Sequence, residues 1–395
     1  MKKTLMALAV GAAFAAPAAY ADVTISGAIN MGVAYLNVGN ASTAGGSLDG
    51  TSNFGVTSNY TNVTISSLED LGGGLKLDFA AQIAWDTKSV NTLSNRNSHI
   101  GLVGESWGGV WIGSNENIYE RYFYTIDPLD GAAGLGGNLQ MLGTPGGAVF
   151  TTCGQSAGDL SSCGYTWYRR DEQTIWYDSP NFNGFTFGVV WQTNYAKDPG
   201  TSTNPNMYQL GVKYVGTGMP LEAWFAYGNR KDQFGLINAG LTTGGTTSKD
   251  TAWHTGVAYT LGDVKIFGGY EDLKYKVENV ALATDVSEYK RDAWYIGLKW
   301  NLASGYVGAQ WIQALKAKAQ LGSTGSTDTV ADTGANMIGL GYYHNMSKQT
   351  QAYVMGTWID NGNSANYQTA GIGNASSGNL GSTQWGLTVG MKHSF

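Results

Sequence analysis

The chain is poor in charged residues and in proline. Asp, Glu, Lys and Arg make up only 13% of its 395 residues, and 7 prolines stand against 57 glycines. A soluble protein with so few charges would tend to aggregate. A membrane-embedded β-barrel avoids that problem, because lipid covers its outer face and water fills its lumen. The composition therefore favours a barrel over a soluble domain.

Long hydrophobic segments are also missing after the N-terminus. Beyond residue 16, no run reaches the apolar length of a membrane-spanning helix. The mean hydropathy is only −0.18, which fits strands that have one polar and one apolar face. This pattern argues against an α-helical membrane protein.

An excess of positive charge is absent as well. The formal net charge is −6, and removal of Lys2 and Lys3 with an N-terminal leader changes it to −8. A generally basic nucleic-acid-binding protein is thereby excluded, so nucleic acid is not expected as a partner. The net charge does not set the ion preference of a pore, because only charges at a constriction decide that.

Cysteine and histidine are rare. Cys153 and Cys163 lie in a Gly/Ser-rich stretch, and in an oxidising periplasm a local disulfide between them is expected. Their spacing is not that of a Cys-x-x-Cys redox motif, and no histidine lies between residues 100 and 253 to complete a metal site. No metal, cofactor or enzymatic activity is expected, because the histidines are scattered over separate segments: His99, His254, His344 and His393.

The N-terminus has the parts of an export signal. Lys2 and Lys3 precede the apolar stretch from Thr4 to Ala16, which is too short to span a bilayer. Ala19-Tyr20-Ala21 is a small-x-small cleavage site. We therefore expect residues 1–21 to be a signal peptide and the mature chain to begin at Asp22.

Segments of strictly alternating polarity are the main feature that is present. At the C-terminus, one face carries Trp385, Leu387, Val389, Met391, His393 and Phe395, and the other carries only small or polar residues. The first mature segment, from Val23 to Tyr35, alternates in the same way over more than ten residues. That is the length of a tilted transmembrane strand. We expect the first and last strands to pair and close the barrel. Aromatic residues near strand ends indicate girdles at the membrane interfaces.

Short and long connections alternate along the chain. The seven short ones are 68–74, 104–109, 179–184, 216–220, 261–263, 302–305 and 345–348. Long polar stretches lie near 38–58, 87–95, 116–165, 195–206, 231–250, 276–288, 317–334 and 362–380. Tight turns on one rim and long loops on the other are typical of an outer-membrane barrel. The count predicts an all-β fold, a 16-stranded antiparallel transmembrane β-barrel over residues 22–395.

Four segments resemble the general porins of Gram-negative bacteria, especially the trimeric porins of beta-proteobacteria. They are Ser26–Tyr35, Leu68–Phe79, Trp176–Phe185 with its Tyr-Asp-Ser-Pro-Asn-Phe-Asn-Gly-Phe turn, and Gly390-Met-Lys-His-Ser-Phe395. The resemblance implies a homotrimer in the outer membrane, in contact with lipid and lipopolysaccharide. It also implies that the third extracellular loop, here 116–165, folds into the lumen and narrows it. Phe395 would be the signal read by the outer-membrane assembly machinery.

The resemblance also implies which charges line the constriction. The loop would contribute Glu116, Glu120, Arg121, Asp127 and Asp130, and the wall would contribute Arg96 and Arg170, with Arg169 beside it. The alternation of the strands places five lysines on inward faces, and Lys76 is assigned to the pore wall on that ground: Lys76, Lys213, Lys265, Lys299 and Lys392. At two positions where the family usually carries a basic residue on the wall, this chain has uncharged residues instead. They are Asn62 and Ser114, which follows Gly113. Carboxylates in a narrow lumen attract cations. We therefore expect a channel for passive diffusion of ions and small hydrophilic solutes, with a weak preference for cations.

Alternative interpretations stay open at this level. Several loop acids could be solvated or could cap backbone groups, as at Asp127-Pro128. The run of Tyr119, Tyr122, Phe123 and Tyr124 could stack sugar rings in a saccharide-selective channel, or it could pack the loop on the wall. A surface adhesin or structural envelope protein without transport would also need long loops.

Overall fold

The computed structural model describes most of the mature chain. The described residues are 22–43, 46–85, 93–124, 126–129, 135–146, 166–197, 200, 203–238, 241–323, 325, 327–330, 332–369 and 380–395. The expected signal peptide 1–21, the expected disulfide between Cys153 and Cys163, and Asp130 lie outside them.

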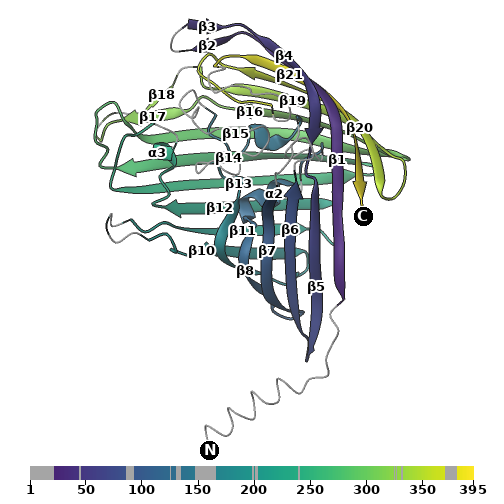
Figure 1. The fold of residues 1–395 in the computed structure, drawn as a ribbon. Coiled ribbons are helices and arrows are strands. Elements are labelled where there is room, and N and C mark those ends of the chain that lie inside the picture. Colours follow the sequence, from purple (N-terminus) through teal and green to yellow (C-terminus); the bar gives the residue numbers. More distant parts are fainter. Residues whose placement is uncertain are drawn as a thin grey trace, which may run out of the picture.

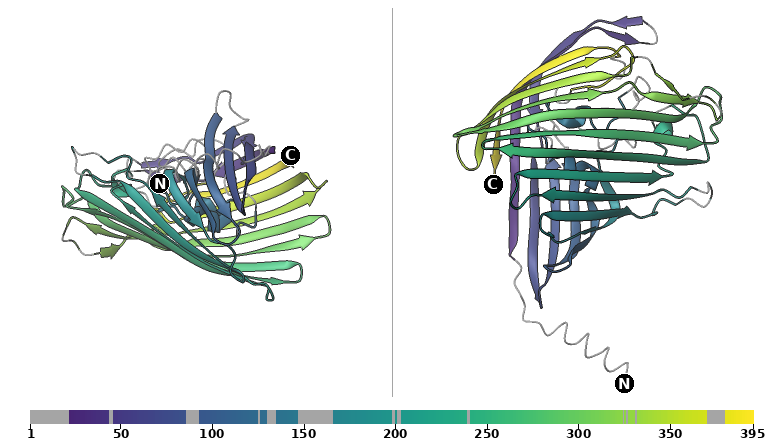
Figure 2. Two further views of the ribbon diagram at one scale, coloured as in Figure 1. Left: turned by 90° about the horizontal axis from the view of Figure 1, so that it is seen from below. Right: turned by 180° about the vertical axis from the view of Figure 1, so that it is seen from behind.

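Sixteen antiparallel strands form a closed barrel, which confirms the predicted fold class (Figure 1). Strands β4 and β5 both pair with β1 and together form one of the sixteen. The barrel strands are β1 Val23–Val38, β4 Thr51–Ser58, β5 Asn62–Gly72, β6 Leu75–Trp85, β7 Leu93–Gly104, β8 Gly108–Glu116, β9 Arg170–Asp178, β10 Phe185–Gln192, β11 Asn206–Val215, β12 Leu221–Lys231, β13 Thr247–Leu261, β14 Val264–Glu278, β15 Val286–Leu302, β16 Gly305–Ala314, β19 Ala335–Asn345, β20 Thr350–Asn361 and β21 Thr383–Ser394. Strands β10 to β16 form one continuous wall, and β1 and β5 to β8, in purple and blue, form another part of the barrel and run in a different direction (Figures 1 and 2).

The smaller elements lie in the long connections. They are β2 Ala41–Thr43, β3 Gly46–Leu48, α2 Ile118–Tyr124, η1 Asn138–Gln140, α3 Gly235–Asn238, β17 Lys318–Leu321 and β18 Thr327–Thr329. Within the described ranges, no helix is long and apolar enough to cross a membrane. The short turns predicted from the sequence all join consecutive barrel strands.

The first and last strands form the seam of the barrel. Strand β1 pairs with β21 from Ala28 opposite Ser394 to Val38 opposite Gln384. Beyond that register, Phe395 and Gly27 exchange two backbone hydrogen bonds of 3.0 Å. The predicted pairing of the two terminal segments is therefore confirmed, and it includes the last residue.

The second barrel strand is longer than the sequence predicted. Thr51–Ser58 falls in the stretch 38–58 that we assigned to a loop, but it forms β4. Phe54 and Val56 are exposed on its outer face. The alternation is hard to recognise because Asn59–Thr61 interrupts it, and Tyr60 there has a positive φ of 58°. A break of this kind ends one run of alternation and starts another, although both runs belong to one strand.

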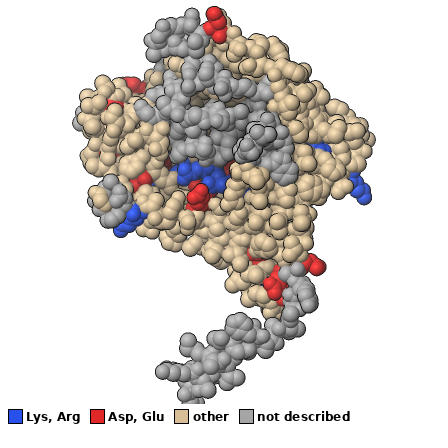
Figure 3. Space-filling model, in the orientation of Figure 1, with Lys and Arg blue, Asp and Glu red and all other residues tan. Residues whose placement is uncertain are grey.

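The outer face of the barrel is apolar. The outward side chains Trp191, Ile266, Ile296, Trp300 and Leu387 are each 42–49% exposed. In the view of Figure 3, most of the described surface carries no charged side chains. Outward aromatic residues meet in pairs, such as Trp294 and Trp311 with ring centroids 4.5 Å apart. This face suits the hydrocarbon of a membrane and aromatic contact with its interfaces.

Candidate pore constriction

The loop after β8 begins with a helix that packs on the inner face of the barrel. This β8–β9 loop comprises residues 117–169, and α2 contacts β10, β11 and β12. Ile118 approaches Gly211 so closely that a Cβ on that glycine would lie 2.4 Å from its side chain. Gly211 leaves that room because it has no side chain, so the helix can rest directly on the wall.

Tyr119 fastens α2 to the wall by polar contacts as well. Its backbone N–H donates to Gln209 Oε1 at 3.0 Å, and its hydroxyl donates to Glu271 Oε2 at 2.8 Å. The ring also packs against Trp167 and His254. Gln209 and Glu271 are fully buried and belong to inward faces, because their neighbours along each strand are exposed or partly exposed.

The described continuation of the loop reaches the opposite side of the lumen. Leu129 packs in a buried cluster with Tyr306, Tyr343, Tyr353 and Met355, which come from β16, β19 and β20. Leu135 packs with inward residues of β1 in another cluster: Ala34, Leu36 and Val38. These contacts place the described loop residues against the inward faces of strands on both sides of the barrel.

A buried ion pair holds the loop to the wall. Arg291 Nη1 donates to Glu271 Oε1 at 2.5 Å, and both side chains are 0% exposed. Arg291 Nη2 also donates to the carbonyls of Met141, at 2.9 Å, and of Thr144. Glu271 accepts the backbone N–H of Gly143 at 2.7 Å in addition to the Tyr119 hydroxyl. The pair therefore joins β14 and β15 to two parts of the β8–β9 loop.

A second cluster lies on the wall formed by β5 to β9. Glu116 Oε1 accepts hydrogen bonds from Arg170 Nη2 at 2.6 Å and from the Tyr60 hydroxyl at 2.9 Å. Arg96 Nη2 lies 3.6 Å from the same oxygen, and its guanidinium lies over the Tyr60 ring, 4.3 Å from the centroid. Two arginines thus surround one carboxylate. Glu116 is the last residue of β8 and not, as we assigned it, the first of the loop.

The remaining predicted charges occupy separate places. Arg121 donates to both carboxylate oxygens of Asp178, at 2.9 and 3.2 Å, and Arg169 contacts Asp171 at 2.6 Å. Glu120 is only 3% exposed. Asp127 Oδ1 accepts the backbone N–H of Leu129 at 3.0 Å, so it caps the turn, the alternative that the Asp-Pro motif had left open. Lys76 lies one residue into β6, at the short-turn end.

The aromatic residues of α2 serve mainly to pack it. Tyr119 and Phe123 are fully buried in the core cluster, against which Tyr122 packs. The side chain of Tyr124 lies outside the described residues.

Glu271 and Arg291 were not among the residues predicted from the sequence. Both follow the inward parity of strands whose lysines, Lys265 and Lys299, we had placed on inward faces. An acid and a base of that parity, about 20 residues apart on consecutive strands, could have predicted an inward-facing ion pair. Their partners in the loop are about 150 positions away in sequence, which no local pattern indicates.

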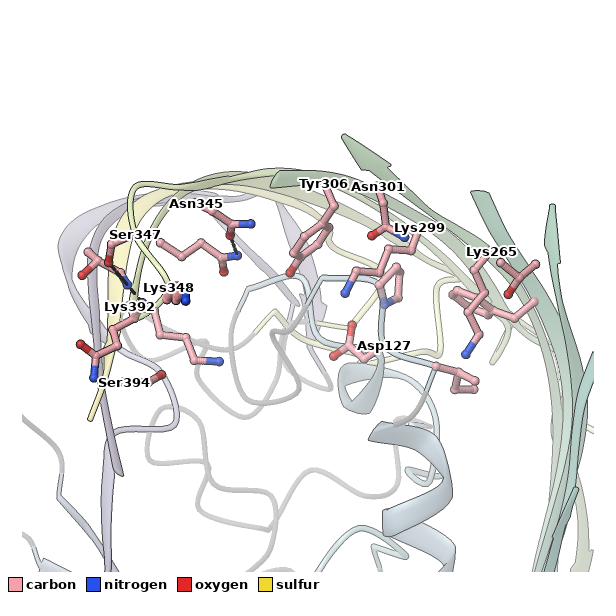
Figure 4. A pocket seen from close by; sticks show the side chains of 17 residues that line it. Asp127, Lys265, Lys299, Asn301, Tyr306, Asn345, Ser347, Lys348, Lys392 and Ser394 are labelled. Carbon is pink, nitrogen blue, oxygen red and sulfur yellow. Dashed lines mark hydrogen bonds between the residues drawn. The ribbon is translucent and has the colours of Figure 1, made fainter. Parts of the chain in front are cut away.

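A lysine-lined cavity lies between the β8–β9 loop and the short-turn rim. Its volume is about 590 Å³, and the loop contributes Ile126, Asp127 and Pro128 to its lining. Four lysines from separate strands and turns also line it: Lys265, Lys299, Lys348 and Lys392. Figure 4 shows their side chains around this space, with Asp127 below Lys299 in this view. Asp127 is the one carboxylate among the described residues of the lining.

Comparison with known proteins agrees with this architecture. A family model described as Gram-negative porin matches residues 7–364. Outer membrane porin protein 32 of Delftia acidovorans is 28% identical over 399 residues, covering 100% of both chains. A solved structure described as an anion-selective porin from Comamonas acidovorans has a TM-score of 0.68 at 22% identity, covering 95% of this chain and 100% of that one. A trimer form of OmpT from Vibrio cholerae has a TM-score of 0.59 at 13% identity, covering 95% and 99%. This chain belongs to the Gram-negative porin family.

Proposed function

We propose that this protein forms a water-filled pore that prefers anions and that the β8–β9 loop narrows it. As a porin, the protein resides in the outer membrane of a Gram-negative bacterium and lets solutes diffuse passively. The observation that carries the anion preference is the cavity below the loop, which is lined by four lysines and by one carboxylate, Asp127. Glu222, outside the lining, pairs with Lys265 at 2.7 Å, so two carboxylates stand against four lysines. Fixed charge in a narrow aqueous passage enriches ions of the opposite sign.

The acids that suggested a cation preference do not support it in their folded positions. Glu116 lies between Arg96 and Arg170, so this cluster carries more positive than negative charge. Asp127 caps a turn next to lysines. The Comamonas structure is described as anion-selective, but at that level of identity it supports the fold alone. The lysines of this chain are therefore the basis of the proposal.

The reversal potential under a KCl gradient tests this proposal. The wild-type protein, reconstituted in planar bilayers, is expected to give a reversal potential shifted toward that of chloride. At about 8 Å in water a unit charge contributes about 0.5 kcal/mol, so each lysine changes the local chloride concentration about twofold. The measurement is made at low salt, because the Debye length of about 30 Å at 0.01 M leaves the fixed charges largely unscreened. A reversal potential on the potassium side would contradict the proposal.

We also propose that the protein forms a homotrimer in contact with membrane lipid and lipopolysaccharide. The exposed apolar faces of the strands suit both lipid and a neighbouring barrel. A trimer form is known for the OmpT structure of similar fold. Chemical cross-linking of the protein in native outer membranes is the direct test, and recovery of monomers alone would count against the trimer.

Deletion of Phe395 is expected to reduce the amount of membrane-inserted protein severalfold. The residue supplies two backbone hydrogen bonds to Gly27 at the seam, and its ring closely approaches the Gly27 backbone. We propose that it is also read by the outer-membrane assembly machinery. Quantitative blotting of outer-membrane fractions measures the yield, and single-channel recording of the inserted fraction should give near-wild-type conductance. Phe395→Tyr, which keeps the backbone bonds and an aromatic ring, serves as the matched control. Normal yield after the deletion would contradict the assignment.

A saccharide-selective channel is the second candidate function. It would use the aromatic run of α2, but Tyr119 and Phe123 are buried and cannot present ring faces to a solute. A partly buried Tyr122 is left for stacking. Saturable block of the ion current by sugars, lost in Tyr122→Ala, would favour this function over the general pore. A sealed barrel without conductance would instead favour an adhesin or structural envelope protein.

A further inference from the structure

We propose that the lysine-lined cavity is a binding site for multivalent organic phosphates that enter from the short-turn rim. The inference rests on the proposed function, because the site requires an open pore with a positive lumen. It goes further in assigning a ligand class, a location and a side of entry.

The position of the cavity determines the side of entry. Its lining includes residues next to three short turns and the C-terminus: Thr260, Asn301, Ser347 and Ser394. The loop segment Ile126–Pro128 bounds it toward the long-loop side. In a porin the short turns face the periplasm. A ligand from the periplasm therefore meets the lysines first, whereas a ligand from outside must first pass the β8–β9 loop.

The register of the wall brings like charges together. Lys265 on β14 and Lys299 on β15 are directly paired across the two strands. Like charges directly opposite each other destabilise a sheet. Exclusion from lipid explains why each lysine points inward, but it does not explain why two of them are adjacent. Lys265 has a partner in Glu222 at 2.7 Å, and the ammonium of Lys299 lies 3.9 Å above the Tyr306 ring. A multivalent anion would offset the repulsion between the two lysines that these contacts do not remove.

The other two lysines face this pair from across the cavity. Lys392 comes from β21 and Lys348 from the exposed turn between β19 and β20. In Figure 4 they stand on the side opposite Lys265, with the cavity between. A lysine acts as a compact point charge that suits phosphate. Charges on both sides favour a ligand with phosphates on opposite edges over a single small anion.

The uncharged lining supports an organic body that carries hydroxyl groups. Amide and hydroxyl side chains make up much of it, among them Asn301, Asn345, Ser347 and Gln349. The volume of about 590 Å³ lies in the range of small-molecule sites. A cyclic polyol with several phosphate groups matches the size, the charge and the hydrogen-bonding character of the cavity.

Side-specific block of the ion current tests the site. Wild-type protein is inserted in one orientation in planar bilayers, and protease cleavage of the long loops identifies the outer side. myo-Inositol hexakisphosphate on the short-turn side is expected to block potassium chloride current saturably. The same concentration on the other side should block more weakly, and uncharged myo-inositol should not block. The double variant Lys299→Gln/Lys392→Gln should weaken the block about tenfold, as expected for two lost charges.

Two controls keep the outcomes distinct. Lys249→Gln/Lys276→Gln also removes two positive charges, at residues of β13 and β14 that do not line the cavity, and should leave the block unchanged. If Lys299→Gln/Lys392→Gln fails to insert, Lys348→Gln in the exposed turn replaces it. Equal block from both sides, or equal block of the wild type and the lysine variants, would overturn the site. Absence of block with a chloride-side reversal potential would overturn the site and leave the anion preference intact. A potassium-side reversal potential in KCl alone would overturn the proposed function itself.

Discussion

Replacing Arg291 with methionine is expected to loosen the β8–β9 loop and to give larger, noisier single-channel currents. Arg291 and Glu271 are fully buried and bind Tyr119, Met141, Gly143 and Thr144 of the loop. Removal of one partner of a buried ion pair costs about 3–5 kcal/mol, because the other charge is left uncompensated. Single-channel recording measures the conductance and noise, and thermal unfolding in detergent measures the loss of stability.

Two further variants separate the buried charge from general damage. The double variant Glu271→Met/Arg291→Met removes both charges and is expected to recover much of the stability, as apolar replacements of buried ion pairs often do. Lys290→Met alters the neighbouring outward residue, which contacts Asp272 at 2.7 Å, and should leave the channel quiet. Quiet wild-type conductance in Arg291→Met would show that the ion pair does not hold the loop.

Reversing the charge of two cavity lysines is expected to reverse the ion preference. Lys299→Glu/Lys392→Glu changes the fixed charge by four units, at two lysines that line the cavity from different strands. At about 8 Å in water this amounts to about 2 kcal/mol, or about thirtyfold in local chloride concentration. The reversal potential under a dilute KCl gradient should move from the chloride side to the potassium side.

The control for this reversal is an equal charge change outside the lumen. Lys249→Glu/Lys276→Glu also changes the charge by four units, at residues of β13 and β14 that do not line the cavity, and should keep the chloride preference. Unchanged selectivity in Lys299→Glu/Lys392→Glu would mean that another part of the lumen sets the preference. In that case the arginines around Glu116 become the next positions to test.

The barrel could be predicted from the sequence because its strands obey a local rule. A strand with lipid on one side and water on the other must alternate apolar and polar residues. Strand β1 does so from Val23 to Tyr35, and β21 does so from Trp385 onward. Prediction failed at β4, where Asn59–Thr61 breaks the alternation between Phe54 and the next run. It also misplaced Glu116 by one residue, because pairing of Glu116 with Arg170 continues β8 past the end of its apolar pattern.

The candidate site was predicted only in its composition. Arg96, Arg170 and Glu116 were named as pore residues, but the sequence assigned the acid to the loop and the bases to the wall. Their contact at one wall cluster depends on the pairing of β8 with β9. Lys265, Lys299 and Lys392 were assigned to inward faces, and all three line the cavity. Their meeting around one cavity depends on how β14, β15 and β21 curve around the lumen, and Lys348 in the turn between β19 and β20 was not predicted to join them.

The alternation, the turn spacing and the terminal motif by themselves determined the number of strands, the closure of β1 on β21 and the membrane environment. These properties follow from the period of side chains along each strand, which is local. The tertiary structure alone decided which charges neutralise one another, where the β8–β9 loop rests and which sign of charge dominates below it. Those properties depend on contacts between residues far apart in sequence, such as Tyr119 with Glu271 and Arg291 with Met141. Such contacts are set by closure of the barrel and packing within it, and they leave no periodic trace in the chain.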